Sequence, residues 1–84
     1  MGVEYHIKFQ KPKGYDLKTF LAGLENPKNT FGSKAFTAKE IKEGLYFCDH
    51  CWSEKASVAF KRIVDEMLYR SDKVIVEDSE AKKG

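Results

Sequence analysis

The residues best suited to chemistry lie together in the middle of the chain. Cys48 and Cys51 are separated by two residues, one of which is His50. Two thiols at this spacing can exchange a disulfide or bind a metal ion. Zinc prefers four such ligands in a tetrahedron, and these could be Cys48, Cys51, His50 and His6. Thiol-redox and zinc chemistry are therefore two alternatives to a third interpretation, in which Cys48 is partly buried and Cys51 is inert.

The cysteine pair follows a segment expected to be a strand, and Ser53 is placed to begin a helix just after it. This order resembles the thioredoxin-like oxidoreductases over a short stretch of the chain. The resemblance implies a nucleophilic cysteine at a helix start, where the helix dipole lowers the pKa of a thiol, and Cys51 is the better placed of the two. The chain departs from that family because its only prolines, Pro12 and Pro27, do not precede a late strand.

No other catalytic set is evident. His6 and His50 could take part in acid–base chemistry, but no spacing of serine, aspartate or glutamate completes a nucleophilic triad around them. The glycines at positions 14, 23, 32 and 44 form no phosphate-binding loop of the GxGxxG or GxxxxGK type. We therefore expect a protein that is not an enzyme and that needs no cofactor, with zinc as the alternative.

Hydrophobic periodicity predicts the elements that must position these side chains. Residues 3–10 alternate between apolar and polar types, as in a half-buried strand. Asp16 is placed to cap a helix that stops near Asn26, and Ser53 to cap a second helix that ends near Ser71. Residues 27–34 are typical of a loop, and residues 73–78 of a final strand. The second helix is expected to bury one stripe: Ala56, Phe60, Ile63, Val64, Met67 and Leu68.

The segment before the cysteines has two interpretations. Residues 42–44 could turn one strand into the next, with residues 45–48 as the second arm of a hairpin. Thr37 and Glu40 also fit the start of a helix, which would make the protein mostly helical with a helix over residues 37–52. We favour the hairpin.

The favoured order is strand, helix, strand, strand, helix, strand. It resembles the βαββαβ or ferredoxin-like sandwich, an α+β fold in which two helices cover one face of a four-stranded antiparallel sheet. The first and third strands are then neighbours, and the residues expected to face the helices are Tyr5, Ile7, Phe9, Leu45 and Phe47. The open face would carry His6, Lys8, Tyr46, Cys48 and His50.

Length and composition fit one small domain. The chain has 84 residues, of which 42% are hydrophobic and 33% charged, as expected for a packed globule. We predict a single domain over residues 1–78 and a disordered polar tail over residues 79–84. No apolar run is long enough to span a bilayer and no signal peptide is evident, so a cytoplasmic protein is expected. A chain this short buries a limited core, which leaves a homodimer open.

Charge is distributed unevenly, and aromatic residues suggest contact points. Residues 1–42 hold eight lysines against four acidic residues, although the formal net charge of the whole chain is only +2. Trp52 and Tyr46 are the best anchor candidates, since these residue types dominate protein interfaces. Together with His50, His6 and Lys8 they predict a partner-binding surface. We expect a small non-enzymatic binding domain that acts as an inhibitor, adaptor or regulatory subunit of a larger protein.

A nucleic-acid partner is the further alternative. Residues 42–47, with the sequence KEGLYF, resemble the third-strand motif of RNA recognition motifs, a family that shares the βαββαβ order. The resemblance implies binding of single-stranded nucleic acid through Tyr46 and the lysines. Leu45 stands where that family has an aromatic residue, and Tyr46 where it has a small one.

Overall fold

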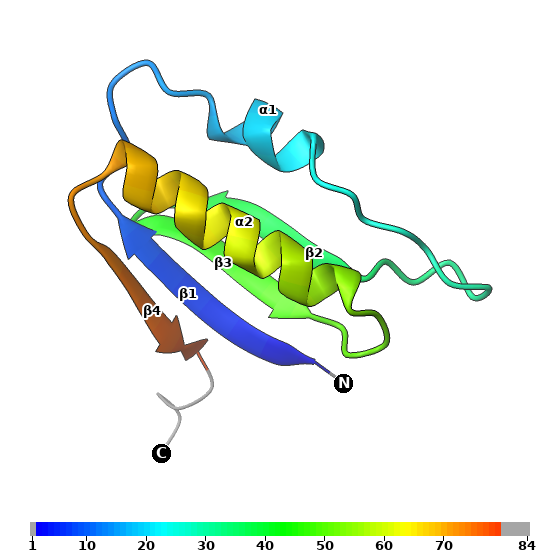
Figure 1. Cartoon of the computed structure of the whole chain (residues 1–84). Helices are drawn as coiled ribbons and strands as arrows, with labels where there is room; N and C mark the ends of the chain where they lie inside the picture. The colour runs from blue at the N-terminus through cyan, green and yellow to red at the C-terminus, as the bar shows by residue number, and fades with distance from the viewer. Residues whose placement is uncertain (1, 80–84) are drawn as a thin grey trace.

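A computed structural model describes residues 2–79 of the chain (Figure 1). The elements follow in the order β1 (Val3–Phe9), α1 (Leu17–Ala22), β2 (Phe36–Ile41), β3 (Gly44–Asp49), α2 (Lys55–Arg70) and β4 (Val74–Asp78). The strands form one antiparallel sheet in the spatial order β2-β3-β1-β4. This is the predicted α+β, ferredoxin-like layout. The alternative helix over residues 37–52 is wrong, because that span contains β2, the following turn and β3.

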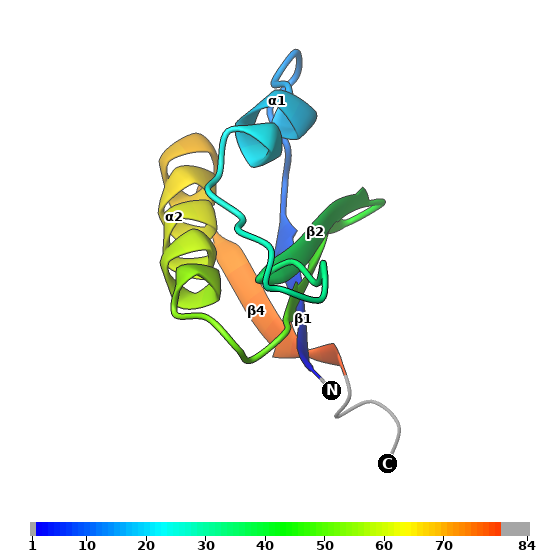
Figure 2. The same ribbon diagram turned by 90° about the vertical axis from the view of Figure 1, so that its right-hand side faces the viewer.

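Both helices lie on the same side of the sheet (Figures 1 and 2). The alternation predicted for β1 is confirmed: Ile7 is fully buried, while Tyr5 and Phe9 pack against the same core. From β3, Leu45 and Phe47 are also fully buried, and Phe36 of β2 stacks on Phe47 with ring centroids 5.2 Å apart. The hydrophobic core therefore fills the space between the sheet and the helices.

The first helix is shorter than predicted. Asp16 caps it as expected, since its carboxylate accepts hydrogen bonds from the Thr19 backbone N–H at 3.2 Å and from the Thr19 hydroxyl at 2.6 Å. The helix ends at Ala22 rather than near Asn26, because the Gly23 N–H bonds back to Phe20 in a tighter turn. Leu24 still reaches the core from beyond the helix end.

The second helix buries a narrower stripe than predicted. Its fully or almost fully buried residues are Ala56, Ala59, Ile63 and Met67, spaced three or four residues apart. Leu68 is about half exposed, because it lies one helical step round from Met67 and away from the sheet. The carboxylate of Glu66 accepts a hydrogen bond from the Tyr15 hydroxyl at 2.7 Å, which ties α2 to the start of α1.

Gly44 fixes how closely β3 approaches β1. It follows the two-residue turn that joins β2 to β3, and it is buried with a backbone φ of +155°. A Cβ atom at this position would lie 2.0 Å from the backbone oxygen of Ile7. Only glycine fits this contact, so the pairing that aligns the two central strands depends on it.

The described residues bear on the predictions about membrane-spanning segments and about the C-terminal tail. No helix within residues 2–79 is long and apolar enough to cross a membrane. Ser79 is described, whereas the rest of the predicted tail lies outside the described residues.

Candidate functional site

The face of the sheet away from the helices carries a mixed set of polar and apolar side chains. We call it the open face, and by strand register and alternation it consists of Glu4, His6, Lys8, Thr37, Lys39, Ile41, Tyr46, Cys48, Ile75 and Glu77. The predicted members His6, Lys8, Tyr46 and Cys48 lie on it. The residues from β2 and β4 were missed, although the alternation in residues 36–41 holds the necessary signal.

The centre of the open face is organised by pairs across neighbouring strands. His6 lies directly opposite Tyr46, and their ring centroids are 6.3 Å apart in an edge-on arrangement. On the other side of β1, the Lys8 ammonium lies 3.1 Å from a Glu77 carboxylate oxygen. Both partners of that ion pair are about one third exposed, so it contributes little to stability. The surface therefore offers a partner rings, charges and hydrogen-bonding groups together.

The Tyr46 hydroxyl remains protonated over the whole physiological range. Burial raises its pKa to about 12, and the neighbouring Cys48 and Glu4 side chains add to the shift. A neutral phenol can donate a hydrogen bond as well as accept one. Tyr46 can therefore act as a polar anchor, and it is not placed to act as a base near neutral pH.

His50 and Trp52 lie in the turn between β3 and α2. The His50 ring nitrogen Nε2 is 2.8 Å from the Thr37 hydroxyl, which places His50 next to the end of the open face. The Trp52 indole N–H donates to the backbone oxygen of Lys34 at 2.8 Å. Trp52 is 38% exposed, so it both supports the segment before β2 and leaves part of its ring accessible.

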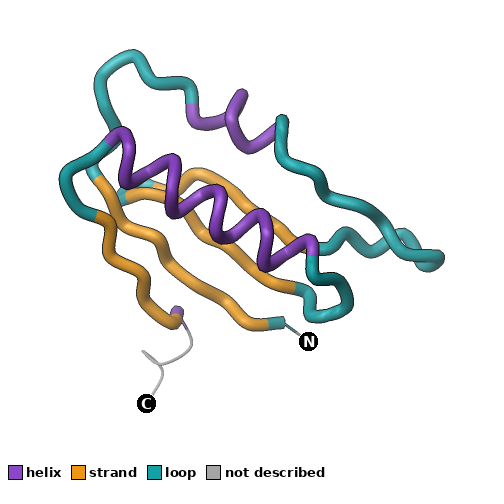
Figure 3. The backbone as a smooth tube through the Cα atoms, in the orientation of Figure 1, coloured by secondary structure: helices purple, strands orange, loops and turns teal. Residues whose placement is uncertain are grey.

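The segment that Trp52 supports runs away from the body of the molecule and returns to β2 (Figure 3). We call residues 27–35 the projecting loop. The Asn29 side-chain oxygen accepts the backbone N–H groups of Phe31 at 2.9 Å and Ser33 at 3.0 Å. The backbone of Asn29 bonds to Ser33 and Gly32, and Ala35 bonds to Pro27 at the base. The loop is therefore held in one shape by its own hydrogen bonds.

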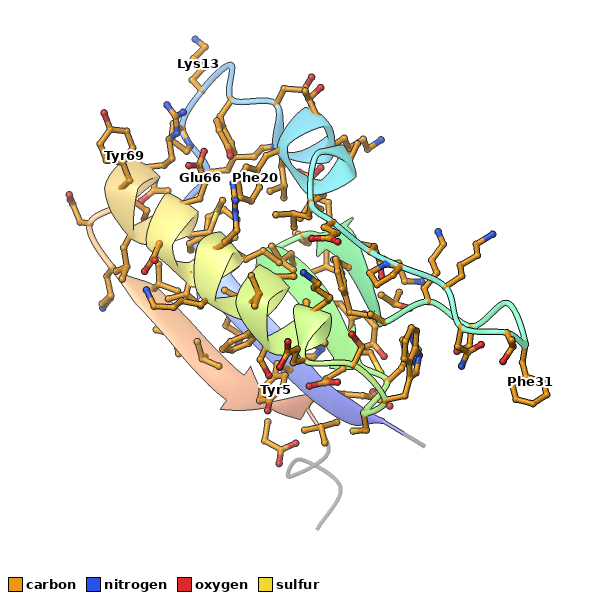
Figure 4. All side chains as sticks on the ribbon, turned by 45° about the vertical axis from the view of Figure 1, so that its right-hand side comes forward. Tyr5, Lys13, Phe20, Phe31, Glu66 and Tyr69 are labelled. Carbon is orange, nitrogen blue, oxygen red and sulfur yellow. The ribbon has the colours of Figure 1, made fainter. Side chains whose placement is uncertain are left out.

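Phe31 stands at the tip of this loop. Its side chain points away from the rest of the molecule (Figure 4), and 92% of the residue surface is exposed. A large apolar side chain exposed on an ordered projection is accessible to another molecule and can fill an apolar pocket there. Sequence reasoning missed Phe31, because periodicity assigns a face only to residues within helices and strands.

The predicted thiol and metal residues are only partly brought together. Cys48 is 7% exposed and lies on the open face, whereas Cys51 is exposed in the turn, where its backbone φ is +67°. Cys51 precedes the first residue of α2 by four positions, so its thiol does not lie in the first turn of that helix. No group of three or more His, Cys, Asp or Glu side chains in the described part of the chain is arranged to hold a metal ion.

The segment that resembles the third strand of RNA recognition motifs presents one aromatic side chain to the open face. Leu45 and Phe47 face the helices and are fully buried, which leaves Tyr46 as the outward aromatic residue of β3. Fold and site together define a small α+β domain with a ferredoxin-like sheet that is covered on one face. Comparison of the chain with protein-family models, curated proteins and solved structures gives no match.

Proposed function

We propose that this chain is a small non-enzymatic binding domain that acts by docking on a larger protein. The observation that carries the proposal is Phe31, an apolar ring presented to solvent at the tip of an ordered loop. An inhibitor, adaptor or regulatory subunit would use such a residue as an anchor that fills an apolar pocket on its partner. A preformed loop loses little conformational freedom on binding, which favours affinity.

The residues around the base of the projecting loop extend this contact area. Trp52 holds the loop through its bond to Lys34, and His50 bonds to Thr37 three residues further along the chain. From there the open face continues with Tyr46, His6 and Lys8. We assign Phe31 the role of anchor and these polar and aromatic residues the role of the surrounding rim.

The experiment compares two aromatic residues that are exposed at opposite ends of the molecule. Phe31 lies at the loop tip, and Tyr69, which is 81% exposed, lies near the end of α2 (Figure 4). Wild-type protein, Phe31→Ala and Tyr69→Ala are immobilised and used to recover stoichiometric partners from a lysate of the source organism. A recovered partner is then purified and titrated calorimetrically against all three.

We expect Phe31→Ala to weaken partner binding by about tenfold or more, as loss of an interface anchor does. Tyr69→Ala should bind like the wild type. Because neither ring is buried, both variants should keep the wild-type free energy of unfolding, which excludes misfolding as the cause. Equal affinity of Phe31→Ala and the wild type would contradict the proposed anchor.

The nucleic-acid alternative predicts a different behaviour of the wild-type protein. A protein that neutralises phosphates is retained on single-stranded DNA at low salt and released steeply as salt rises. If the chain is retained in this way and no protein partner is recovered, its ligand is a nucleic acid and not a protein. A thiol or zinc function would instead appear as bound metal in the intact mass or as a thiol that titrates well below neutral pH.

A further inference from the structure

The outer edge of β2 ends the sheet and is paired at only one position. The His50 N–H bonds to the Ala35 oxygen, so Ala35 and every second residue after it direct their backbone groups toward β3. The residues between them, Phe36, Ala38 and Glu40, direct their backbone groups outward from the sheet. At Phe36 the Asn26 side chain fills both places: it accepts the backbone N–H at 3.1 Å and donates to the backbone oxygen at 2.9 Å. The Asn26 side-chain amide thus makes the two hydrogen bonds that a neighbouring strand would make at this position.

Beyond Phe36 the edge is free. No hydrogen bond within residues 2–79 uses the outward N–H and C=O groups of Ala38 and Glu40. These four groups lie in register with the pair that Asn26 satisfies. An extended peptide could therefore continue along β2 from the place where Asn26 stops.

A cavity of about 310 Å³ opens beside this edge, between α1 and β2. Leu21, Leu24 and Asn26 line it from the helix side, and Phe36, Ala38 and Lys34 line it from the strand side. Side chains of an added strand alternate between the two faces of the sheet, so every second one would point toward the helices and into this cavity. The walls mix polar and apolar groups, and Leu21, Leu24 and Phe36 offer apolar contacts to a side chain such as valine or leucine at those positions.

The stretch of chain that contains β2 and leads into it carries more lysines than carboxylates. Residues 17–42 contain the lysines 18, 28, 34, 39 and 42 against two carboxylates, Glu25 and Glu40. Lys55 and Lys11, which lie outside that span, form ion pairs with those two carboxylates. None of the five lysines has an ion-pair partner among the described residues. The surroundings of the β2 edge therefore favour a negatively charged ligand.

We propose that the outer edge of β2 binds an extended, acidic peptide segment of a partner protein, which adds a fifth strand to the sheet. Its backbone pairs with Ala38 and Glu40, alternate apolar side chains enter the cavity, and its carboxylates meet the lysines. This inference does not rest on the anchor role of Phe31, and either one can fail without the other. The opposite edge, β4, carries the acidic residues Glu77 and Asp78, so charge assigns such a peptide to β2.

The test uses two labelled eight-residue peptides, one alternating valine with glutamate and one alternating valine with lysine. Fluorescence anisotropy measures their binding to the wild type and to two proline variants. Ala38→Pro removes an outward N–H from the β2 edge, and Val76→Pro removes an outward N–H from the β4 edge. We expect the glutamate peptide to bind, the lysine peptide not to bind, and Ala38→Pro to weaken binding by roughly tenfold while Val76→Pro leaves it unchanged.

A second variant pair and a direct readout cover the case in which Ala38→Pro does not fold. Lys34→Glu should weaken glutamate-peptide binding more than Lys73→Glu, which places the same charge change just before β4. In the wild type, the peptide should slow hydrogen exchange at the Ala38 and Glu40 amides.

Three results would overturn the proposal. The first is binding that both proline variants weaken equally, and the second is exchange at Ala38 and Glu40 that the peptide does not alter. The third is a wild-type dimer in sedimentation that Ala38→Pro dissociates, because the occupant of the edge would then be a second copy of the chain.

Discussion

Replacement of Gly44 by alanine should be the most damaging methyl addition at any glycine of the sheet. The new Cβ would lie 2.0 Å from the Ile7 oxygen, 3.0 Å from the Lys8 Cα and 3.1 Å from the Ile7 carbonyl carbon. All three are main-chain atoms, so no side chain can rotate away. Restoring an ordinary contact near 3.4 Å needs a separation of about 1.4 Å between β3 and β1, nearly a third of the normal spacing between strands.

The cost follows from what that separation breaks. The hydrogen bond from the Phe9 N–H to the Glu43 oxygen, 3.2 Å long, lies next to the clash and would be lost. The half-buried Phe9 N–H left without a partner costs about 1–3 kcal/mol, and a non-glycine residue at positive φ adds about 1–2 kcal/mol. We expect Gly44→Ala to lower the free energy of unfolding by roughly 2–5 kcal/mol. That is a large part of the stability of a domain of this size.

Gly14→Ala is the matched control. Gly14 also has a positive φ, +81°, but a Cβ there meets no atom within 4 Å. Its cost should therefore be the conformational part alone, about 1–2 kcal/mol. Urea denaturation followed by circular dichroism measures both variants. If Gly44→Ala lay within about 1 kcal/mol of Gly14→Ala, the close approach of β3 to β1 would not have the role assigned to it.

Three further predictions concern other parts of the molecule. Asn26→Leu removes both hydrogen bonds to the edge of β2 and should cost about 1–3 kcal/mol in urea denaturation, whereas a change below about 0.3 would contradict the edge role. The pKa of Glu66 is lowered from its ordinary value of 4.5, and the largest cause is the hydrogen bond from Tyr15. This contact therefore stabilises the fold above pH 4.5, and the stabilisation is lost as pH falls through the lowered pKa. Tyr15→Phe should therefore reduce the drop in urea midpoint below about pH 4.5, and an unchanged profile would count against the contact. In the native protein a thiol reagent should modify exposed Cys51 quickly and Cys48 slowly, with both fast in urea; two equally fast thiols would contradict the burial of Cys48.

The parts of the fold that depend on local periodicity could be predicted from the sequence. Alternation in residues 3–10 gave β1 its buried face, and the spacing of Ile63 and Met67 gave α2 its buried stripe. The end of α1 could not be placed, because Leu24 continues the helical spacing although the chain has already left the helix. Periodicity records which residues reach the core and not the backbone conformation that takes them there.

The contacts that shape the candidate site were beyond sequence reasoning for a different reason. The hydrogen bonds from Asn26 to Phe36 and from Trp52 to Lys34 join residues 10 and 18 positions apart, with no repeating pattern between them. Asparagine in a loop is normally a turn former, and nothing in its neighbours indicates that its amide pairs with a strand edge. Such contacts become visible only once the strands are placed in space.

Phe31 and the β2 edge share a physical property that connects the two proposals. Burying a phenylalanine stabilises a protein by about 1.5–3 kcal/mol. The isolated domain does not gain this stabilisation from Phe31, which is exposed at the tip of a loop ordered by its own hydrogen bonds. Likewise, four outward backbone groups of β2 are left to water beside a cavity that Leu21, Leu24 and Phe36 partly line. Neither feature stabilises the isolated chain, and each contributes favourable free energy only when another molecule covers it. The two surfaces are joined through residues 34–38, so an occupant of one would lie close to an occupant of the other.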